Sequence, residues 1–142
     1  LLPWKHPFLM VDRVVECVPH RRIVTHKNVT CNDPMAGGGD EHGSELPGVM
    51  IVEGMSQSAA LLFQMTYPST TPGRVPLLGT LKASWERPAR PGDLLTYTVE
   101  AIKMTSRMGI FRGEACVDGA PIARADLGFS VGDPDVSREE GE

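Results

Sequence analysis

The sequence predicts an α+β domain in which one long apolar helix is wrapped by a curved antiparallel sheet. Residues 46–67 form the longest helix-compatible run of the chain, and Pro68 closes it because proline cannot continue a helix. Short runs rich in β-branched residues lie on both sides of this helix. A helix that is apolar around most of its circumference needs protein on several sides, and a sheet that curves around it supplies that wall.

The strands are predicted in order along the chain. Before the helix, residues 14–18 and 22–31 are separated by Pro19-His-Arg, as the two strands of a hairpin are. Four further strands are expected after the helix, over residues 75–85, 94–104, 110–117 and 121–131. Asp118-Gly119 is a hairpin turn signal between the last two, and Trp85 is expected in the core. Residues 1–131 are therefore predicted to form a single domain, and the acidic residues 132–142 are expected to be disordered.

The predicted helix carries one charged residue, Glu53, among apolar neighbours. Gln57 lies four residues later on the same helical face, where its amide can hydrogen-bond the carboxyl group. Because burial of a lone carboxylate is costly, Glu53 is expected to be paired or to have a raised pKa, as a catalytic acid or base has. A glutamate in the first turns of a helix also simply stabilises the helix dipole, and chemistry alone leaves both interpretations open.

Composition excludes several classes of function. The formal net charge is -4 and no basic run occurs, so nucleic acid is not an expected partner. Cys17, Cys31 and Cys116 are far apart and odd in number, so neither a disulfide framework nor a metal site is predicted, and reduced core thiols are expected. No apolar run is long enough to span a bilayer, and no charged leader precedes an apolar segment. A cytoplasmic protein without membrane contact is expected.

A glycine-rich loop, residues 35–46, leads into the helix. Its glycines are Gly37, Gly38, Gly39 and Gly43. Three adjacent glycines can cradle a phosphate, but no lysine follows in the P-loop pattern and the acidic neighbours would repel an anion. Nucleotide binding is therefore not expected.

Four blocks of the sequence resemble one enzyme family in content and order. They are residues 2–13, 28–34, 47–57 and 87–93. They closely resemble blocks of the 3-hydroxyacyl-[acyl-carrier-protein] dehydratases of the bacterial fatty acid pathway, and the likeness runs from about residue 2 to residue 131. The resemblance implies a hot-dog fold and a dimer that can assemble into a trimer of dimers. It also implies reversible loss of water from a 3-hydroxyacyl thioester, which is carried on the phosphopantetheine of an acyl carrier protein, without a metal or a dissociable cofactor.

The resemblance also implies an active site shared by two protomers. In that family a histidine on the loop before the helix and a carboxylate on the helix of the neighbouring protomer divide the acid and base roles. The carboxylate position matches Glu53, Gln57 would hold it, and the backbone N–H of Gly48 would bind the thioester oxygen. The cations Arg74, Lys82, Arg87 and Arg90 form either a solvated face or a surface that steers the acidic carrier protein.

The family's loop histidine does not carry over. The family's loop reads Gly-His-Phe-Pro-Gly, and the residue count places Gly39 where its histidine is expected. His42 lies three positions later, and three extended residues span roughly 10 Å, so His42 reaches the pocket only if the loop follows another path. The expected function is a dehydratase subunit of fatty acid or polyketide biosynthesis that completes its site with a histidine-bearing hot-dog partner. The alternatives are a homomeric dehydratase that uses His42, a non-catalytic acyl-binding or scaffold subunit, and a hot-dog thioesterase.

Overall fold

The computed structural model describes residues 2–40, 43–68, 74 and 76–132. One helix follows four short strands and precedes four long ones. The helix is α1 (Gly48–Thr66). The strands before it are β1 (Arg13–Val18), β2 (Arg22–Asn28), β3 (Gly37–Asp40) and β4 (Gly43–Glu45). The strands after it are β5 (Pro76–Trp85), β6 (Leu94–Met104), β7 (Met108–Val117) and β8 (Ala120–Val131). The predicted acidic tail, residues 132–142, lies outside the described residues except for Gly132.

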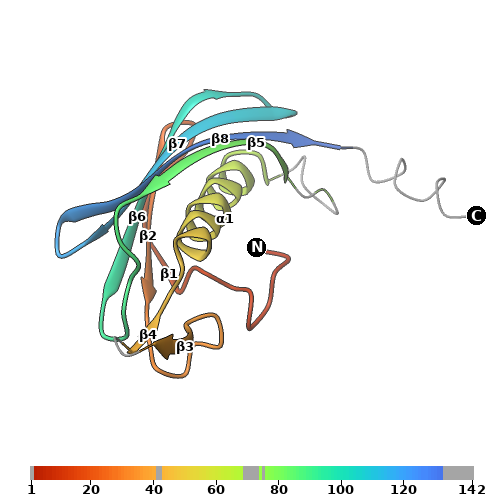
Figure 1. Cartoon of the computed structure of the whole chain (residues 1–142). Coiled ribbons are helices and arrows are strands. Elements are labelled where there is room, and N and C mark those ends of the chain that lie inside the picture. Colours follow the sequence, from red (N-terminus) through yellow and green to blue (C-terminus); the bar gives the residue numbers. More distant parts are fainter. Residues whose placement is uncertain (1, 41–42, 69–73, 75, 133–142) are drawn as a thin grey trace, which may run out of the picture.

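Six strands form one antiparallel sheet in the order β1-β2-β6-β7-β8-β5. This sheet curves around one side of α1, as Figure 1 shows. The small β3–β4 hairpin lies apart from it, at the end of the molecule where α1 begins (Figure 1). The predicted helix enclosed by an antiparallel sheet is therefore confirmed.

The helix begins where proline sets the backbone and ends one residue before the predicted end. Pro47 is extended, with φ -62° and ψ 151°, and its carbonyl accepts hydrogen bonds from the N–H groups of Met50 and Ile51. Tyr67 leaves helical geometry, and its N–H closes the last turn on the carbonyl of Phe63.

The core lies between α1 and the concave face of the sheet. Its fully buried side chains include Ile51, Met55 and Leu62 of the helix, and Leu95, Tyr97 and Val99 of β6. The alternation along residues 94–104 therefore places the apolar face of β6 on the helix, as predicted.

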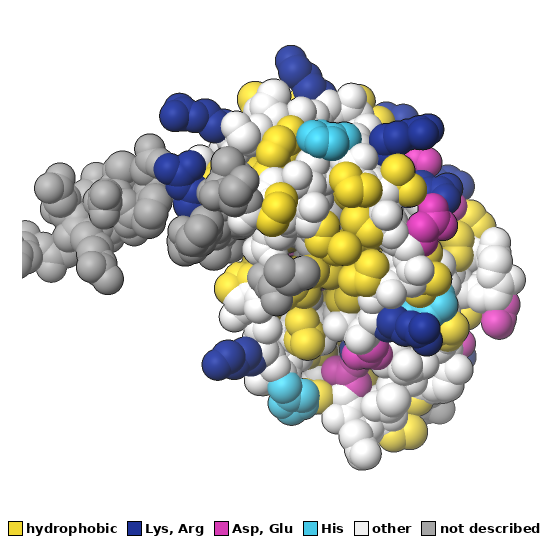
Figure 2. All heavy atoms as spheres, turned by 180° about the vertical axis from the view of Figure 1, so that it is seen from behind, with side chains coloured by type: hydrophobic (Ala, Val, Ile, Leu, Met, Phe, Trp, Pro, Cys, Tyr) yellow, Lys and Arg dark blue, Asp and Glu magenta, His cyan; other side chains and the backbone are white. Residues whose placement is uncertain are grey.

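Hydrophobic side chains also reach the surface. On the face drawn in Figure 2 they gather in one area, with Lys and Arg side chains around it. Val49, near the start of the helix, is 59% exposed, and Trp85 is 50% exposed at the end of β5. The expectation that Trp85 is a core residue is wrong for the single protomer. The reason is its place at the end of an edge strand, where the helix of its own protomer covers it on one side only.

One turn lies where the sequence predicts it, one strand ends earlier than predicted, and one hairpin was not predicted. Asp118 and Gly119 both have positive φ, 52° and 77°, which is the geometry of a tight hairpin between β7 and β8. Strand β2 stops at Asn28 instead of residue 31, because the N–H of Asp33 bonds the carbonyl of Thr30 and turns the chain. The loop over residues 35–46 contains the β3–β4 hairpin, although glycine-rich segments rarely form strands.

Candidate active site

Glu53 and Gln57 meet on α1 as their spacing predicts. Gln57 Nε2 lies 3.1 Å from Glu53 Oε1 and donates a hydrogen bond to it. The Glu53 side chain is partly buried, whereas Gln57 is fully buried at 0% exposure. The other carboxylate oxygen of Glu53, Oε2, has no hydrogen-bond partner among the described residues.

Gln57 is held in place by backbone groups of the N-terminal segment, residues 8–10. Gln57 Oε1 accepts a hydrogen bond of 2.8 Å from the backbone N–H of Met10. Gln57 Nε2 donates a bond of 2.7 Å to the carbonyl of Phe8. The amide therefore uses its oxygen and both N–H groups, which satisfies a polar group that no water reaches.

The surroundings favour the protonated form of Glu53. Burial raises the pKa of the Glu53 carboxyl above its ordinary value, and the hydrogen bond from Gln57 opposes that rise. No charged side chain of the described residues contributes to this shift. Glu53 is therefore a carboxyl group that can hold a proton at a higher pH than an exposed glutamate does, which suits a general acid.

The start of α1 offers unused backbone donors one turn before Glu53. Within the described residues, neither Gly48 nor Val49 donates its N–H to a hydrogen-bond acceptor. A Cβ at position 48 would lie 2.5 Å from the indole ring of Trp85, so only glycine fits there. Trp85 therefore packs directly on the helix start, where the helix dipole and the free N–H groups favour a negatively charged oxygen.

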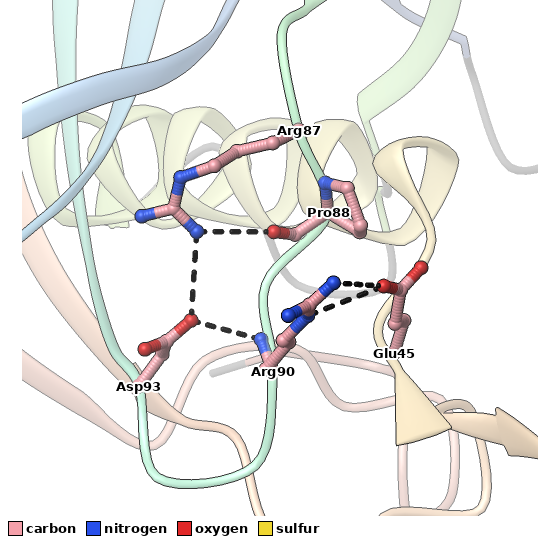
Figure 3. A network of polar contacts seen from close by, with 5 residues as sticks. All are labelled: Glu45, Arg87, Pro88, Arg90 and Asp93. Atoms are coloured by element: carbon pink, nitrogen blue, oxygen red, sulfur yellow. Dashed lines mark hydrogen bonds and ion pairs between the residues drawn. The ribbon is translucent and has the colours of Figure 1, made fainter. Parts of the chain in front are cut away.

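One end of the loop before the helix is fixed to the turn at residues 87–93. Leu46 donates its N–H to the carbonyl of Ala89 at 2.8 Å. Arg90 binds Glu45 at the end of β4, with Nη2 2.9 Å and Nε 3.2 Å from Oε1 (Figure 3). The carboxylate of Asp93 accepts the backbone N–H of Arg90 at 2.8 Å and faces Arg87 Nη1 at 3.8 Å.

Two of the four cations that were expected to face solvent or a carrier protein are therefore engaged within the protomer. Arg87 and Arg90 hold the turn and the loop, and their charges face Asp93 and Glu45. Lys82, on β5, forms no ion pair with another described residue. Of these four, Lys82 is the clearest candidate for attracting an acidic partner.

The other end of the loop is fixed by a buried ion pair. Lys27 Nζ lies 2.8 Å from Asp33 Oδ2, and each side chain is only 6% exposed. The second oxygen of Asp33 accepts the N–H of Met35 at 3.1 Å. The segment between these anchors carries Gly39, within β3, and His42, which lies outside the described residues. None of the described histidines hydrogen-bonds Glu53.

Cys17, Cys31 and Cys116 are free thiols. Cys17 and Cys116 are half-buried, and the expectation of a core position is wrong for Cys31, which is exposed because it follows the end of β2 instead of continuing the strand into the core. No described helix is long and apolar enough to cross a membrane. No cluster of three or more metal-ligating His, Cys, Asp or Glu side chains occurs among the described residues.

The sequence has clear relatives. Residues 2–126 match the FabA-like domain family. The chain is 35% identical over 142 residues to the 3-hydroxyacyl-[acyl-carrier-protein] dehydratase FabZ of Myxococcus xanthus, a match that covers 99% of this chain and 92% of the relative. It is 41% identical over 129 residues to the FabZ of Anaeromyxobacter dehalogenans, which covers 89% and 83%.

Solved structures share the fold. The dehydratase heterocomplex ApeI:P from Xenorhabdus doucetiae superposes with a TM-score of 0.83 at 14% identity, over 99% of this chain and 95% of that one. A hypothetical thioesterase with coenzyme A from Streptococcus pneumoniae superposes with a TM-score of 0.65 at 12% identity, over 84% of each chain. These likenesses confirm the predicted hot-dog fold.

Proposed function

This chain belongs to the FabA-like domain family and is a dehydratase of 3-hydroxyacyl thioesters on acyl carrier protein, and we propose that it completes its active site with a second, histidine-bearing hot-dog subunit. Its place is in fatty acid or polyketide biosynthesis. The observation that carries the proposal is an asymmetry: Glu53, Gln57 and the helix start at Gly48 form one half of a site. At the position of the other half, the loop carries Gly39.

In the proposed reaction the two halves supply a base and an acid. The partner's loop histidine takes the proton from C2 of the substrate, and the electron pair moves toward the thioester oxygen, which the Gly48 N–H binds. The C2=C3 double bond then forms as the C3–O bond breaks, and the hydroxyl group leaves as water with the proton of Glu53. A proton returned from the histidine to Glu53 restores both groups. Two side chains and one backbone N–H supply all of this chemistry, so the proposal needs no metal or dissociable cofactor.

The raised pKa of Glu53 supports the acid role. A hydroxide ion is a poor leaving group, and a positioned acid that holds its proton to a higher pH than an exposed carboxyl group reduces that difficulty. Burial provides this property at Glu53, because the partly buried carboxyl group loses hydration that its charged form needs.

The surface of the protomer supports association through β5. This strand is one edge of the described sheet, and its Leu81 and Trp85 lie opposite the buried Leu127 and Ala123 of β8. Cross-strand neighbours share one face of a sheet, so Leu81 and Trp85 face the core side, yet each is 50% exposed. The concave face therefore continues beyond the helix of its own protomer, and a second hot-dog subunit is the proposed cover.

A reconstitution assay tests the proposal. The chain alone, the chain with a hot-dog subunit encoded beside it, and the same mixture carrying His42→Ala are each given a 3-hydroxyacyl carrier protein. We expect little enoyl product from the chain alone, turnover in the mixture, and almost no effect of His42→Ala. Dehydration by the pure chain that disappears with His42→Ala would refute the partner and establish the homomeric alternative.

The same assay separates the remaining alternatives through the product. An enoyl thioester is the product of dehydration, whereas free acid would indicate hydrolysis, and binding without turnover would indicate an acyl-binding or scaffold subunit. The solved thioesterase structure from Streptococcus pneumoniae shares only the fold with this chain, at 12% identity, whereas the FabZ of Anaeromyxobacter dehalogenans is 41% identical. Dehydration is therefore the expected outcome.

A further inference from the structure

We propose that residues 8–10, which we call the strap, act through Gln57 to keep the proton of Glu53 on its Oε2 atom. The inference deepens the proposed acid role of Glu53 and rests on it. It assigns the strap and Gln57 a positioning role: they select the oxygen that can donate.

The first step is the orientation of the Gln57 amide. The oxygen and nitrogen of an amide side chain are told apart by their hydrogen-bond partners. At Gln57 both partners in the strap are backbone groups whose character is fixed. The N–H of Met10 can only donate, so it faces Oε1, and the carbonyl of Phe8 can only accept, so it faces Nε2. A flipped amide would bring two donors together at Met10 and two acceptors together at Phe8.

The second step carries this orientation to Glu53. With one N–H of Nε2 on the carbonyl of Phe8, the other is directed to Glu53 Oε1 at 3.1 Å. An oxygen that faces an N–H donor must accept, so Oε1 cannot carry a proton that points along the same line. When Glu53 is protonated, its proton therefore lies on Oε2, and Oε1 is the carbonyl oxygen.

The third step is that Oε2 presents its proton to the substrate in one defined position. Oε2 has no partner among the described residues, so its proton is free to move to a substrate hydroxyl. Gln57 is fully buried and bonded at three points, so the carboxyl group cannot easily exchange its two oxygens by rotation. The acid is thus presented by one defined atom, which removes an orientational cost from the proton transfer.

Infrared difference spectroscopy across a pH titration tests this assignment on the purified chain. The protonated Glu53 carboxyl band is identified by its loss in Glu53→Gln. In Gln57→Met the side chain keeps a similar length but donates no hydrogen bond. We expect the Glu53 band to move to higher frequency in this variant, because the carbonyl oxygen Oε1 loses its donor, and we expect the pKa of Glu53 to rise further, because the bond from Gln57 that opposes the rise is gone.

Ser58→Ala is the matched control. Ser58 is also buried on α1, where its hydroxyl hydrogen-bonds Thr25 Oγ1 at 2.7 Å and the carbonyl of Gly54 at 2.7 Å, and it forms no hydrogen bond with Glu53. Ser58→Ala removes a buried polar group of the same helix, so any non-specific loss of stability or packing appears in both variants. An unchanged band in Gln57→Met, or an equal shift in Ser58→Ala, would overturn the proposal.

A second measurement keeps the proposal testable if Gln57→Met does not fold. In the wild-type chain, hydrogen exchange at the Met10 amide is followed through the titration of Glu53 and corrected for its intrinsic pH dependence. Constant protection is expected, because the amide of Gln57 keeps its orientation in both protonation states. Loss of protection when Glu53 is protonated would show that the amide flips and would refute the assignment. Both measurements use no turnover, so they stand apart from the test of the partner subunit.

In the active assembly, Gln57→Met should lower kcat by about tenfold and leave KM nearly unchanged, because the acid is misoriented while the substrate contacts remain. A rise in KM at constant kcat would indicate a substrate-binding role for Gln57 and would contradict the positioning role.

Discussion

Replacement of Glu53 by glutamine removes the ionisable group while keeping the shape of the side chain. The new amide still offers an oxygen to Gln57 Nε2, so the hydrogen bond of 3.1 Å has a replacement. Because the native carboxyl group is partly desolvated and has no ion-pair partner among the described residues, Glu53→Gln should change the free energy of unfolding by no more than about 1 kcal/mol. The fold and the assembly should therefore survive.

The turnover rate of the Glu53→Gln assembly should fall strongly. The loss of a positioned acid or base costs about 10²–10⁴-fold in rate, which corresponds to about 3–5 kcal/mol of transition-state stabilisation. The assay is enoyl-thioester formation by the active assembly, with thermal unfolding measured on the same preparations. Unchanged turnover in a folded Glu53→Gln assembly would remove Glu53 from the mechanism.

Three further predictions follow from single contacts. Burial raises the pKa of Glu53 in the folded state, so this group contributes stability below its unfolded-state pKa and loses that contribution as the pH rises through its folded-state pKa. Over this pH window, the melting temperature of the wild type should therefore fall relative to that of Glu53→Gln. Lys27→Met leaves the buried Asp33 carboxylate unpaired and should lower the free energy of unfolding by about 3–5 kcal/mol in urea titrations. In Gly54→Ala, the new methyl group would overlap the fully buried Tyr97 ring, and the stability loss should be about 1–3 kcal/mol.

Each of the last two has a control. Arg112→Ala breaks an exposed ion pair with Asp126 and should cost less than about 1 kcal/mol; a loss as large as that of Lys27→Met would contradict the role of burial. Tyr97→Leu makes room next to position 54, so Gly54→Ala should cost less in that background than in wild type. Additive losses would show that the two residues do not compete for space.

Local chemistry was sufficient to predict the helix, the six strands of the large sheet and the contact between Glu53 and Gln57, but not the β3–β4 hairpin. Proline and β-branched residues mark the ends of α1 and the long strands, and Asp118-Gly119 marks a turn that needs positive φ at both positions. The contact between Glu53 and Gln57 follows from helical geometry alone, because residues four apart lie on one face.

Contacts between residues that are far apart in the sequence could not be predicted from local residue patterns. Met10 and Gln57 are 47 positions apart, and Glu45 and Arg90 are 45 positions apart. A single sequence does not show which of several exposed-looking arginines will meet which carboxylate, so Arg90 was expected to face solvent or a carrier. The exposed fraction of Trp85 depends on how far β5 extends past the helix, which is a property of the whole sheet.

The central claim is that the working pocket combines Glu53 with a histidine from another subunit. The direct measurement is enoyl formation by two mixtures: one in which Glu53→Gln removes the carboxyl group of this chain, and one in which only the partner's own helix carboxylate is removed. We expect the first mixture to lose turnover by at least about a hundredfold and the second to retain it, because the opposite pocket contains Gly39 in place of a histidine. Retained turnover in the first mixture together with loss in the second would contradict the account.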